Sequence, residues 1–413
     1  MRDSLFGLIV WILLLGMGGG QTVWGQNNRF TDRAFLPSPV VRGMGDAGGA
    51  VPGIEQAFFY NPAHLPHVTS HFTILGVQGA ASPSIDEQVQ FYNEDVKPAS
   101  GDDNSLTSEQ QAALLRETDA LRPRPSRGHG AVLLPSFVYA PGALAVGGGV
   151  FAKTGINYRI VEGRRGAPKM HLLSRTDVLA LAAVGLDLRV IGLSNVTVGL
   201  TGTQTRRFLA FKRQPLDPPS GEGPDALLNG SVFDLDAGMV YRPDWWGRLP
   251  GTLRFGGALY DLLGRGYDYS RADRSGRMPF LGVVVEPSAG ERGATEAEVA
   301  RQRFALAPSY RVGTSYQYPT LFFMDDVAVA LDYQGYGTGG PAPLSRLHFG
   351  VRAEIVDPVR LRGGVSSGYL SGGLGVEVGA FHFDYALHGA EAGQRHRERR
   401  TLVHTARLLL RLE

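Results

Sequence analysis

The chain has 413 residues and a formal net charge of +2, with both signs of charge interspersed, so nothing in its charge indicates nucleic-acid binding. It has no cysteine, which excludes a disulfide framework and cysteine-based metal or redox chemistry. Glycine is frequent, with 56 residues, but 20 Phe, 15 Tyr and 4 Trp accompany it. This combination favours many strands with tight turns and close backbone approaches over disorder.

Residues 1–25 are predicted to be a secretory signal peptide. A positive start precedes an apolar stretch at residues 5–15, which is too short to span a bilayer. Val23 and Gly25 stand at the −3 and −1 positions of the expected cleavage site. An uncleaved N-terminal anchor is the alternative, and in both cases the chain is exported. No later apolar run reaches about 18 residues, so no membrane helix is expected.

Residues 26–67 are predicted to form a compact plug (hatch) segment without strands. Glycine and alanine at 42–50 permit a tightly folded backbone, and Asn61-Pro62 marks a sharp turn directly after three aromatic residues. A wide β-barrel has an open aqueous lumen unless something fills it, and large barrels are often plugged. This segment is the part of the chain that suits such a role.

Residues 81–129 are predicted to be a helical insertion rather than a strand region. Helices are expected at 85–92 and at 108–121, where a capping-box pattern begins the second helix and Pro123 follows its end. Few apolar residues are available to dock this second helix. We therefore expect the insertion to cover the outer mouth of a barrel.

Residues 68–413 show the alternation of apolar and polar side chains that strands produce. In residues 232–242 every second residue from Phe233 to Tyr241 is apolar, and in residues 346–355 the same holds from Leu347 to Ile355. Fourteen strands are predicted, near 68–80, 130–140, 143–155, 176–191, 195–212, 230–242, 251–263, 304–317, 321–335, 344–355, 359–366, 371–379, 380–389 and 400–412.

The lengths of the connections distinguish a soluble antiparallel sheet from a membrane barrel. Connections after even-numbered strands are short, whereas most of those after odd-numbered strands are long; the short link near 367–370 breaks the rule. Alternation of short turns with long loops is typical of an outer-membrane barrel. The predicted fold is all-β: an antiparallel transmembrane β-barrel of about 14 strands with an N-terminal plug and a helical first extracellular loop.

Many charged residues are predicted to point into the lumen. They are Asp187, Arg189, Asp234, Asp236, Arg254, Asp332, Arg352, Glu354, Arg360, Arg362, Glu377, His382, Asp384 and Arg407. An enzymatic role is one interpretation, because His382 and Asp384 share a face. However, no nucleophile motif accompanies them, and salt bridges around a plug explain the charges more simply.

Three histidines, His64, His67 and His71, occur close together in HLPHVTSH. Such a group can bind a divalent metal. Because Pro66 separates the first two and the third is expected in the first strand, lumen or rim histidines are the favoured interpretation. No metal and no cofactor are expected.

Both ends of the predicted mature chain resemble the FadL/PorV-like outer-membrane barrels. Residues 42–50 (RGMGDAGGA) followed by 60–65 (YNPAHL) are similar to the N-terminal signature of that superfamily, and residues 361–386 are similar to its uncharacterised members. In the family this motif belongs to a plug that closes the lumen. The resemblance thus gives a plug role to Asn61, Pro62 and Ala63, together with Gly45 and Gly48.

Gly147, Gly148 and Gly149 interrupt the third predicted strand. Glycine in the middle of a strand often marks a bulge or a close backbone approach. Since family transporters are thought to release apolar ligands laterally, one interpretation is a kink that opens a side window. The other is clearance for the plug.

The resemblance implies a monomeric, non-enzymatic barrel in the outer membrane that passes hydrophobic small molecules, of the long-chain fatty acid type, passively inward. The expected partners are outer-membrane lipid and such a ligand, and no nucleic acid. A barrel like the type IX secretion component, which binds protein cargo or translocon partners by its extracellular loops, is the alternative. A structural envelope role is a third.

Overall fold

The computed structural model describes residues 36–91, 94–95, 108–121, 126–162, 168–215, 226–243, 250–271, 308–336, 343–391 and 400–413. The predicted signal peptide and the first ten residues of the predicted plug lie outside these ranges. None of the helices described is long and apolar enough to cross a membrane.

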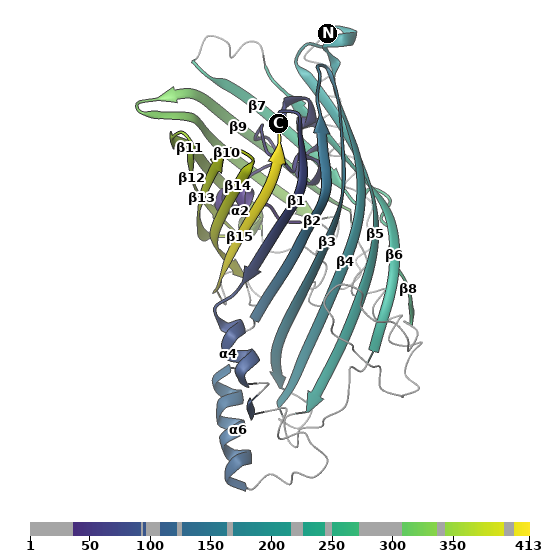
Figure 1. Cartoon of the computed structure of the whole chain (residues 1–413), viewed down its shortest axis with the longest axis vertical. Coiled ribbons are helices and arrows are strands. Elements are labelled where there is room, and N and C mark those ends of the chain that lie inside the picture. Colours follow the sequence, from purple (N-terminus) through teal and green to yellow (C-terminus); the bar gives the residue numbers. More distant parts are fainter. Residues whose placement is uncertain are drawn as a thin grey trace.

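The described chain is dominated by antiparallel strands (Figure 1). They are β1 (His71–Ala81), β2 (Ser126–Tyr139), β3 (Leu144–Glu162), β4 (Pro168–Asp187), β5 (Val196–Pro215), β6 (Ala226–Tyr241), β7 (Thr252–Tyr260), β8 (Asp268–Arg271), β9 (Ser309–Leu321), β10 (Met324–Tyr336), β11 (Leu347–Val356), β12 (Val359–Ser366), β13 (Tyr369–Val378), β14 (Phe381–Glu391) and β15 (Arg400–Leu412). The helical elements are α2 (Pro39–Gly43), α3 (Ala57–Tyr60), η1 (Pro62–His67), α4 (Ser84–Phe91), α6 (Ser108–Leu121), η4 (Leu188–Ile191) and η6 (Pro343–Arg346).

The sheet closes on itself. Strand β1 pairs with both β2 and β15, and β5 pairs with β6, so the sheet has no open edge there. Strands β7 and β8 pair with different stretches of β6 and occupy one position in the wall. Fifteen strands therefore make fourteen positions, which confirms the predicted 14-stranded barrel. The short strand β8 escaped prediction because four residues show no clear alternation.

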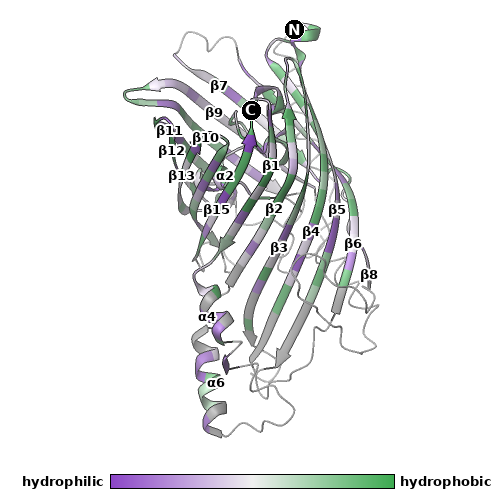
Figure 2. Cartoon of the chain, viewed as in Figure 1, coloured by the Kyte–Doolittle hydropathy of each residue, from purple (hydrophilic) through white to green (hydrophobic). Residues whose placement is uncertain are grey.

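The two faces of the wall differ in polarity, as the alternation predicts. On β14, for example, Phe381 and Phe383 are exposed on the outer face, while His382 and Asp384 are buried on the inner face. Figure 2 shows hydrophobic residues spread along the strands of the wall, with hydrophilic ones between them. An apolar exterior around a polar interior is the arrangement of a transmembrane barrel, whose outer face meets lipid.

The two ends of the barrel are unlike. At one end, the short-turn end, strands are joined by brief connections such as 140–143 and 379–380; the other, the long-loop end, carries α4 and α6 (Figure 1). The wall is also uneven in height, because β4 and β5 have 20 residues each whereas β12 has 8. A tilted strand needs about 9–11 residues to cross the bilayer. The long strands thus extend well beyond the hydrocarbon layer at the long-loop end.

Strand β4 differs most from its prediction at 176–191. It begins earlier, at Pro168, and ends at Asp187, after which the chain forms η4. Its first part has an irregular pattern of polar and apolar residues, so pairing with β3 and β5, rather than amphipathic alternation, extends it. The helix predicted at 108–121 is confirmed as α6, and that predicted at 85–92 is α4.

Residues 36–68, named here the plug segment, lie inside the barrel. Helix α2 packs against β12 to β15, while η1 packs against β3 to β6 on the other side. The buried core follows from this position, since apolar plug residues such as Met44 and Phe58 meet inward residues of the wall such as Phe151 and Leu181.

The lipid-facing wall generates a direct prediction about Leu331, which is exposed on the outer face in the middle of β10. Leu331→Arg should lower the free energy of unfolding by about 2–4 kcal/mol, the cost of an arginine near the bilayer midplane of a barrel. Urea unfolding of the barrel in lipid vesicles measures it. Leu331→Ala is the matched control, and an arginine variant as stable as the alanine variant would contradict a lipid-facing position.

Candidate functional site: the plug and its seat

The turn Asn61-Pro62-Ala63 lies at the centre of the plug segment. Asn61 is fully buried, and its Oδ1 accepts a hydrogen bond from the Ala63 amide (3.1 Å), which caps the start of η1. Its Nδ2 donates to the carbonyl of Gly49 (2.8 Å) and to that of Met239 on β6 (3.2 Å). One side chain thus joins the two halves of the plug segment and fastens both to the wall.

Three wall glycines make room for this turn. Gly185, Gly199 and Gly238 are register partners on adjacent strands β4, β5 and β6, so they form a row on the inner face. A Cβ at Gly238 would overlap the Asn61 amide, one at Gly199 would overlap the Pro62 backbone, and one at Gly185 would lie 2.6 Å from Pro66 Cδ. We name this row the glycine seat. Any larger side chain there would displace the turn.

The glycine-rich half of the plug segment is fitted to the opposite wall. Gly45 has φ 63°, and a Cβ there would collide with the backbone of β11 and β12. Across from it, a Cβ at Gly350 or Gly364 would overlap the Met44–Gly45 backbone. Gly48 packs against Val41 within the plug segment. The predicted plug residues Asn61, Pro62, Ala63, Gly45 and Gly48 thus all lie inside the barrel.

The wall supplies hydrogen-bond donors to the carbonyl groups of the plug segment. These bonds run from Gln78 to Pro37 (2.8 Å), Ser371 to Gly43 (3.3 Å), Arg311 to Asp46, Ser315 to Ala50 (2.6 Å), Arg352 to Pro52 (2.9 Å) and Thr201 to Phe58 (3.1 Å). Conversely, Asp332 Oδ2 accepts from the amides of Gly48 (2.8 Å) and Gly49 (2.7 Å). Buried backbone groups need partners, and an irregular segment cannot provide them all itself.

An ion-pair cluster, the charged latch, fixes the plug segment to β12, β14 and β15. Glu55 of the plug segment pairs with Arg407 (3.2 Å) and Arg411, while Asp384 pairs with Arg407 (2.6 Å) and Arg362 (2.8 Å). Burial alone would raise the pKa of Glu55, but Arg407 and Arg411 outweigh it and hold that pKa below its usual value. The plug carboxylate is therefore ionised at neutral pH.

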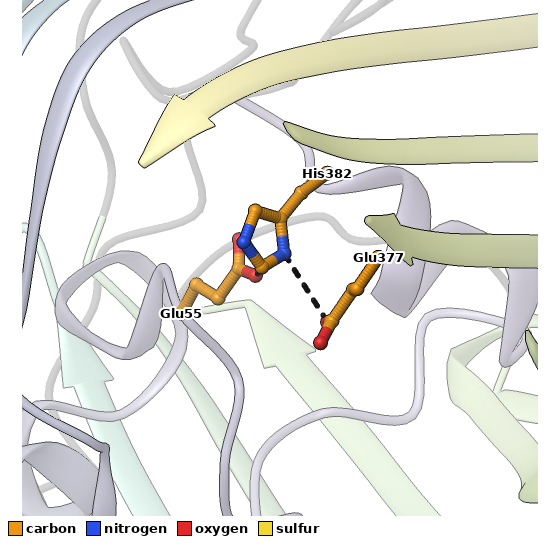
Figure 3. A group of neighbouring side chains, drawn as sticks. All are labelled: Glu55, Glu377 and His382. Carbon is orange, nitrogen blue, oxygen red and sulfur yellow. Dashed lines mark ion pairs between the residues drawn. The ribbon is translucent and has the colours of Figure 1, made fainter. Parts of the chain in front are cut away.

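Beside the latch, His382 lies between Glu55 and Glu377 (Figure 3). Its Nδ1 is 3.4 Å from Glu377 and 4.0 Å from Glu55, and only 4% of its side chain is exposed. The three side chains could converge on a cation. However, Glu377 already pairs with Arg360, and Glu55 pairs with the buried Arg407 and Arg411, so a divalent ion would have to compete with three guanidinium groups. The arrangement favours ion pairing between plug and wall.

The other predicted lumen charges have different partners. Arg352 pairs with Asp326 (2.9 Å), and Arg360 pairs with Glu354 (3.1 Å). Asp236 and Asp234 accept hydrogen bonds from the amides of Asp261 (2.9 Å) and Leu263 (3.1 Å), so they hold the turn that follows β7. 

Arg189 was predicted on a strand, with its side chain in the lumen, and this is wrong. It lies in η4 at the short-turn end, where 57% of its side chain is exposed and it pairs with Asp187 (2.8 Å). The strand ends at Asp187, four residues before its predicted end at 191.

The three histidines do not share a site. His64 Nε2 lies 3.2 Å from the Gly49 carbonyl, His67 Nε2 lies 3.3 Å from Thr197 Oγ1, and His71 Nδ1 lies 2.8 Å from the Thr69 carbonyl. Complete burial, with a small contribution from His67, lowers the pKa of His64 to about 3. His64 is therefore a neutral, hydrogen-bonded core residue of the plug segment.

Strand pairing continues through Gly147, Gly148 and Gly149 on both sides. The irregularity lies opposite, in β2, where a bulge falls between Leu133 and Ser136. A Cβ at Gly149 would lie 2.5 Å from Ser136 Cβ, and those at Gly147 and Gly148 would each lie 3.1 Å from a carbonyl oxygen of a neighbouring strand. Close approach of the neighbouring strands is clearest at Gly149, and a lateral opening at the three glycines stays a prediction.

A second apolar cluster, the long-loop cluster, lies on the inner face nearer to the long-loop end. It consists of Leu173, Leu209, Leu228, Val232, Tyr267 and Tyr269. Arg207 lies beside it, paired with Asp177 through two bonds (2.6 and 3.0 Å) and stacked on the Tyr267 ring at 4.0 Å. All members of this cluster are buried, and Arg207 is paired with a carboxylate, so the cluster is an apolar and aromatic part of the filled inner face. No sequence pattern indicates this cluster, since its members come from four strands or their flanks.

Comparisons with known proteins bear on the architecture. No protein-family model matches the chain, and no curated protein matches it in sequence. Among solved structures, the chain is similar to the toluene transporter TbuX of Ralstonia pickettii (17% identity, TM-score 0.49, 90% of this chain and 97% of that chain), to a FadL homologue of Pseudomonas aeruginosa (12%, 0.41, 91% and 97%) and to the toluene transporter TodX of P. putida (10%, 0.44, 91% and 97%). At these TM-scores the matches carry no argument about ligand or mechanism, and the barrel rests on its own strand pairings.

The glycine seat predicts a specific effect of added bulk. Gly238→Val should push the turn at Asn61 out of place and destabilise the plugged state by about 1–3 kcal/mol, the usual cost of overpacking. Conductance of single barrels in planar bilayers reports the change, as more frequent or larger current openings. Gly202→Val on β5 is the control, since its Cβ would have only ordinary contacts. Equal conductance of the Gly238 variant and the unaltered protein would contradict the seat.

Acidification should weaken the plug. His64 has a pKa of about 3 in the plugged state but about 6.5 in water, so release of the plug takes up a proton between these values. The plugged state should therefore lose about 1.4 kcal/mol per pH unit below pH 6.5 from this residue, and Glu55 adds a loss only below its ordinary value of 4.5.

Conductance measured from pH 7.5 to 4.5 tests this dependence. His64→Gln keeps a donor for the Gly49 carbonyl but cannot titrate, so its openings should depend on pH less steeply than those of the unaltered protein, in which both His64 and His67 titrate. An unaltered protein whose conductance is independent of pH, or a Gln variant with the same pH dependence, would contradict the assignment.

Proposed function

We propose that the protein is a monomeric channel of the bacterial outer membrane that lets hydrophobic small molecules of the long-chain fatty acid type pass inward passively. The observation that carries the proposal is the plug segment inside a closed, lipid-facing barrel, with the long-loop cluster near the end that carries α4 and α6. The buried leucine and tyrosine side chains of this cluster give an apolar solute that enters there a matching environment on the inner face.

The character of the contacts supports a plug that can move. Many of the bonds that hold the plug segment come from single wall side chains, and no pairing in the described sheet includes a plug residue. Side-chain hydrogen bonds contribute about 0.5–1.5 kcal/mol each and can be exchanged for water one at a time. A shift of the plug segment therefore requires no break in the barrel wall.

A non-enzymatic role fits the inner face. The carboxylates of the charged latch pair with arginines, and His382 lies among them without a neighbouring nucleophile among the described residues. Groups committed to ion pairs around a plug are poorly placed for proton transfer to a substrate. The charged residues of the lumen thus suit the holding of a plug better than catalysis.

Protein binding is the second candidate, because α4 and α6 project from the long-loop end (Figure 1). In this alternative the barrel is an anchor, and the helices present a surface to secreted cargo or to translocon partners. It differs from transport in one respect: the plug segment would not need to move.

Cross-linking the plug segment to the wall distinguishes the two. Because the chain has no cysteine, Ala50→Cys and Ser315→Cys introduce a unique thiol pair at residues that are hydrogen-bonded (2.6 Å) in the plugged state. Uptake of radiolabelled oleate and of toluene by cells producing this variant should fall when the pair is oxidised or bridged, and should recover on reduction.

Each single-cysteine variant is the control and should respond to neither treatment. Uptake that is unaffected by the cross-link, combined with co-purification of protein partners that depends on α6, would replace transport by protein binding.

A further inference from the structure

The hairpin of β9 and β10 ends in an unusually apolar turn. Phe322 and Phe323 form it, with 87% and 74% of their surface exposed, and Leu321 precedes them. These two phenylalanines are the most exposed large apolar side chains among the described residues. We name Leu321, Phe322 and Phe323 the hairpin tip.

The backbone of the tip is strained for the residue that it carries. Phe322 has φ 58°, in the left-handed region where two-residue hairpin turns normally place glycine, asparagine or aspartate. A bulky aromatic residue is rarely found there, because its side chain is strained in this conformation. The chain has 56 glycines, so glycine is readily used in its turns. A phenylalanine at this position therefore indicates that its side chain makes contacts outside the folded chain.

A bulge directs the hairpin away from its neighbour. The β10–β11 register shifts between Asp325 and Ala328, and Asp326 within this step has φ 47°. The pairing of β10 with β9 continues beyond the step to the turn itself. Bulges of this kind bend a strand and re-aim its end. In Figure 1 the light-green hairpin accordingly reaches past the ends of β11 to β13 and away from the barrel.

The base of the hairpin is polar and firmly held. Thr320 donates to Asp325 (2.8 Å), and Gln317 donates to Asp326. Asp326 also pairs with Arg352 of β11 (2.9 Å), which donates in turn to the carbonyl of Pro52 in the plug segment (2.9 Å). The tip is thus a fixed apolar projection on a charged, hydrogen-bonded base.

We propose that the hairpin tip inserts into the membrane leaflet at the short-turn end and anchors the barrel at that depth. On the same strand Val329 and Leu331 are exposed on the outer face, and Val356 at the end of β11 is also exposed. Figure 2 shows the end of the hairpin as hydrophobic. An apolar tip on a polar base matches the boundary between acyl chains and headgroups.

The size of the tip favours lipid over a protein partner. A phenylalanine buries about 150–250 Å² at most, so the two together offer less than the roughly 800 Å² that each partner contributes to a stable protein interface. Lipid requires no such minimum, because acyl chains already surround the neighbouring wall. This inference does not depend on which ligand, if any, the barrel passes.

Spin labelling tests the insertion, since the cysteine-free chain accepts a unique label. Phe323→Cys is the test position, because it leaves the left-handed residue in place. The labelled protein is reconstituted in vesicles of phosphatidylethanolamine and phosphatidylglycerol. Accessibility of the label to oxygen, which concentrates in the bilayer, is then compared with its accessibility to a water-soluble nickel chelate.

Two further positions calibrate the measurement. Phe349→Cys on the outer face of β11 reports a lipid-facing label, and Arg116→Cys on the projecting helix α6 reports a water-facing one. The label at 323 should prefer oxygen as the label at 349 does. A label at 323 that prefers the nickel chelate as at 116, or that is shielded from both reagents by protein, would overturn the proposal.

Discussion

The structure depends on one constraint: every backbone polar group inside the barrel must find a partner. The strands satisfy most of theirs by pairing around a closed sheet, which leaves few backbone groups of the wall, such as the Met239 carbonyl, for the plug segment. The plug segment has only short helices, so side chains of the wall must complete its hydrogen bonds. Gln78, Thr201 and Ser315, from widely separated strands, each do so for one carbonyl.

This constraint also explains part of the glycine content. Wall side chains can reach the plug backbone only if the plug segment lies close to the wall. At the closest points the backbone of the wall touches that of the plug segment, and only glycine permits this. The glycine seat on one side and Gly350 with Gly364 on the other are such places. The glycines at these places are therefore a consequence of fitting one irregular peptide into a barrel. Because the charged latch adds ionised groups to the same interface, the plug segment is held by geometry, hydrogen bonds and charge together.

The sequence predicted the barrel well because the signal for a strand is local. Alternation identified all fourteen wall positions, and the parity of loop lengths distinguished a membrane barrel from a soluble sheet. The sequence also predicted α6 correctly, because a capping-box pattern marks the start of that helix and a proline follows its end. Where alternation is irregular, as in the first half of β4 and in β8, prediction failed, because pairing with neighbours determines those strands.

The interior could be predicted only in outline. The motif around Asn61 indicated a plug, yet its three-glycine seat combines positions 185, 199 and 238, which become neighbours only through register. The partners of Glu55 likewise come from the last strand, more than 350 positions away, and no local pattern indicates them. The error at Arg189 has a related origin: alternation does not show where a strand stops and a turn begins.

Amide hydrogen exchange of the reconstituted protein, followed by mass spectrometry at neutral pH, tests the central claim most directly, because it measures the protection of each segment. If the wall encloses the plug backbone and supplies its hydrogen-bond partners, peptides covering residues 41–63 should exchange more slowly than helix α6. Their exchange should be nearly as slow as that of the strands. Exchange of this segment as fast as that of an unfolded peptide would contradict the account, whatever the state of the barrel around it.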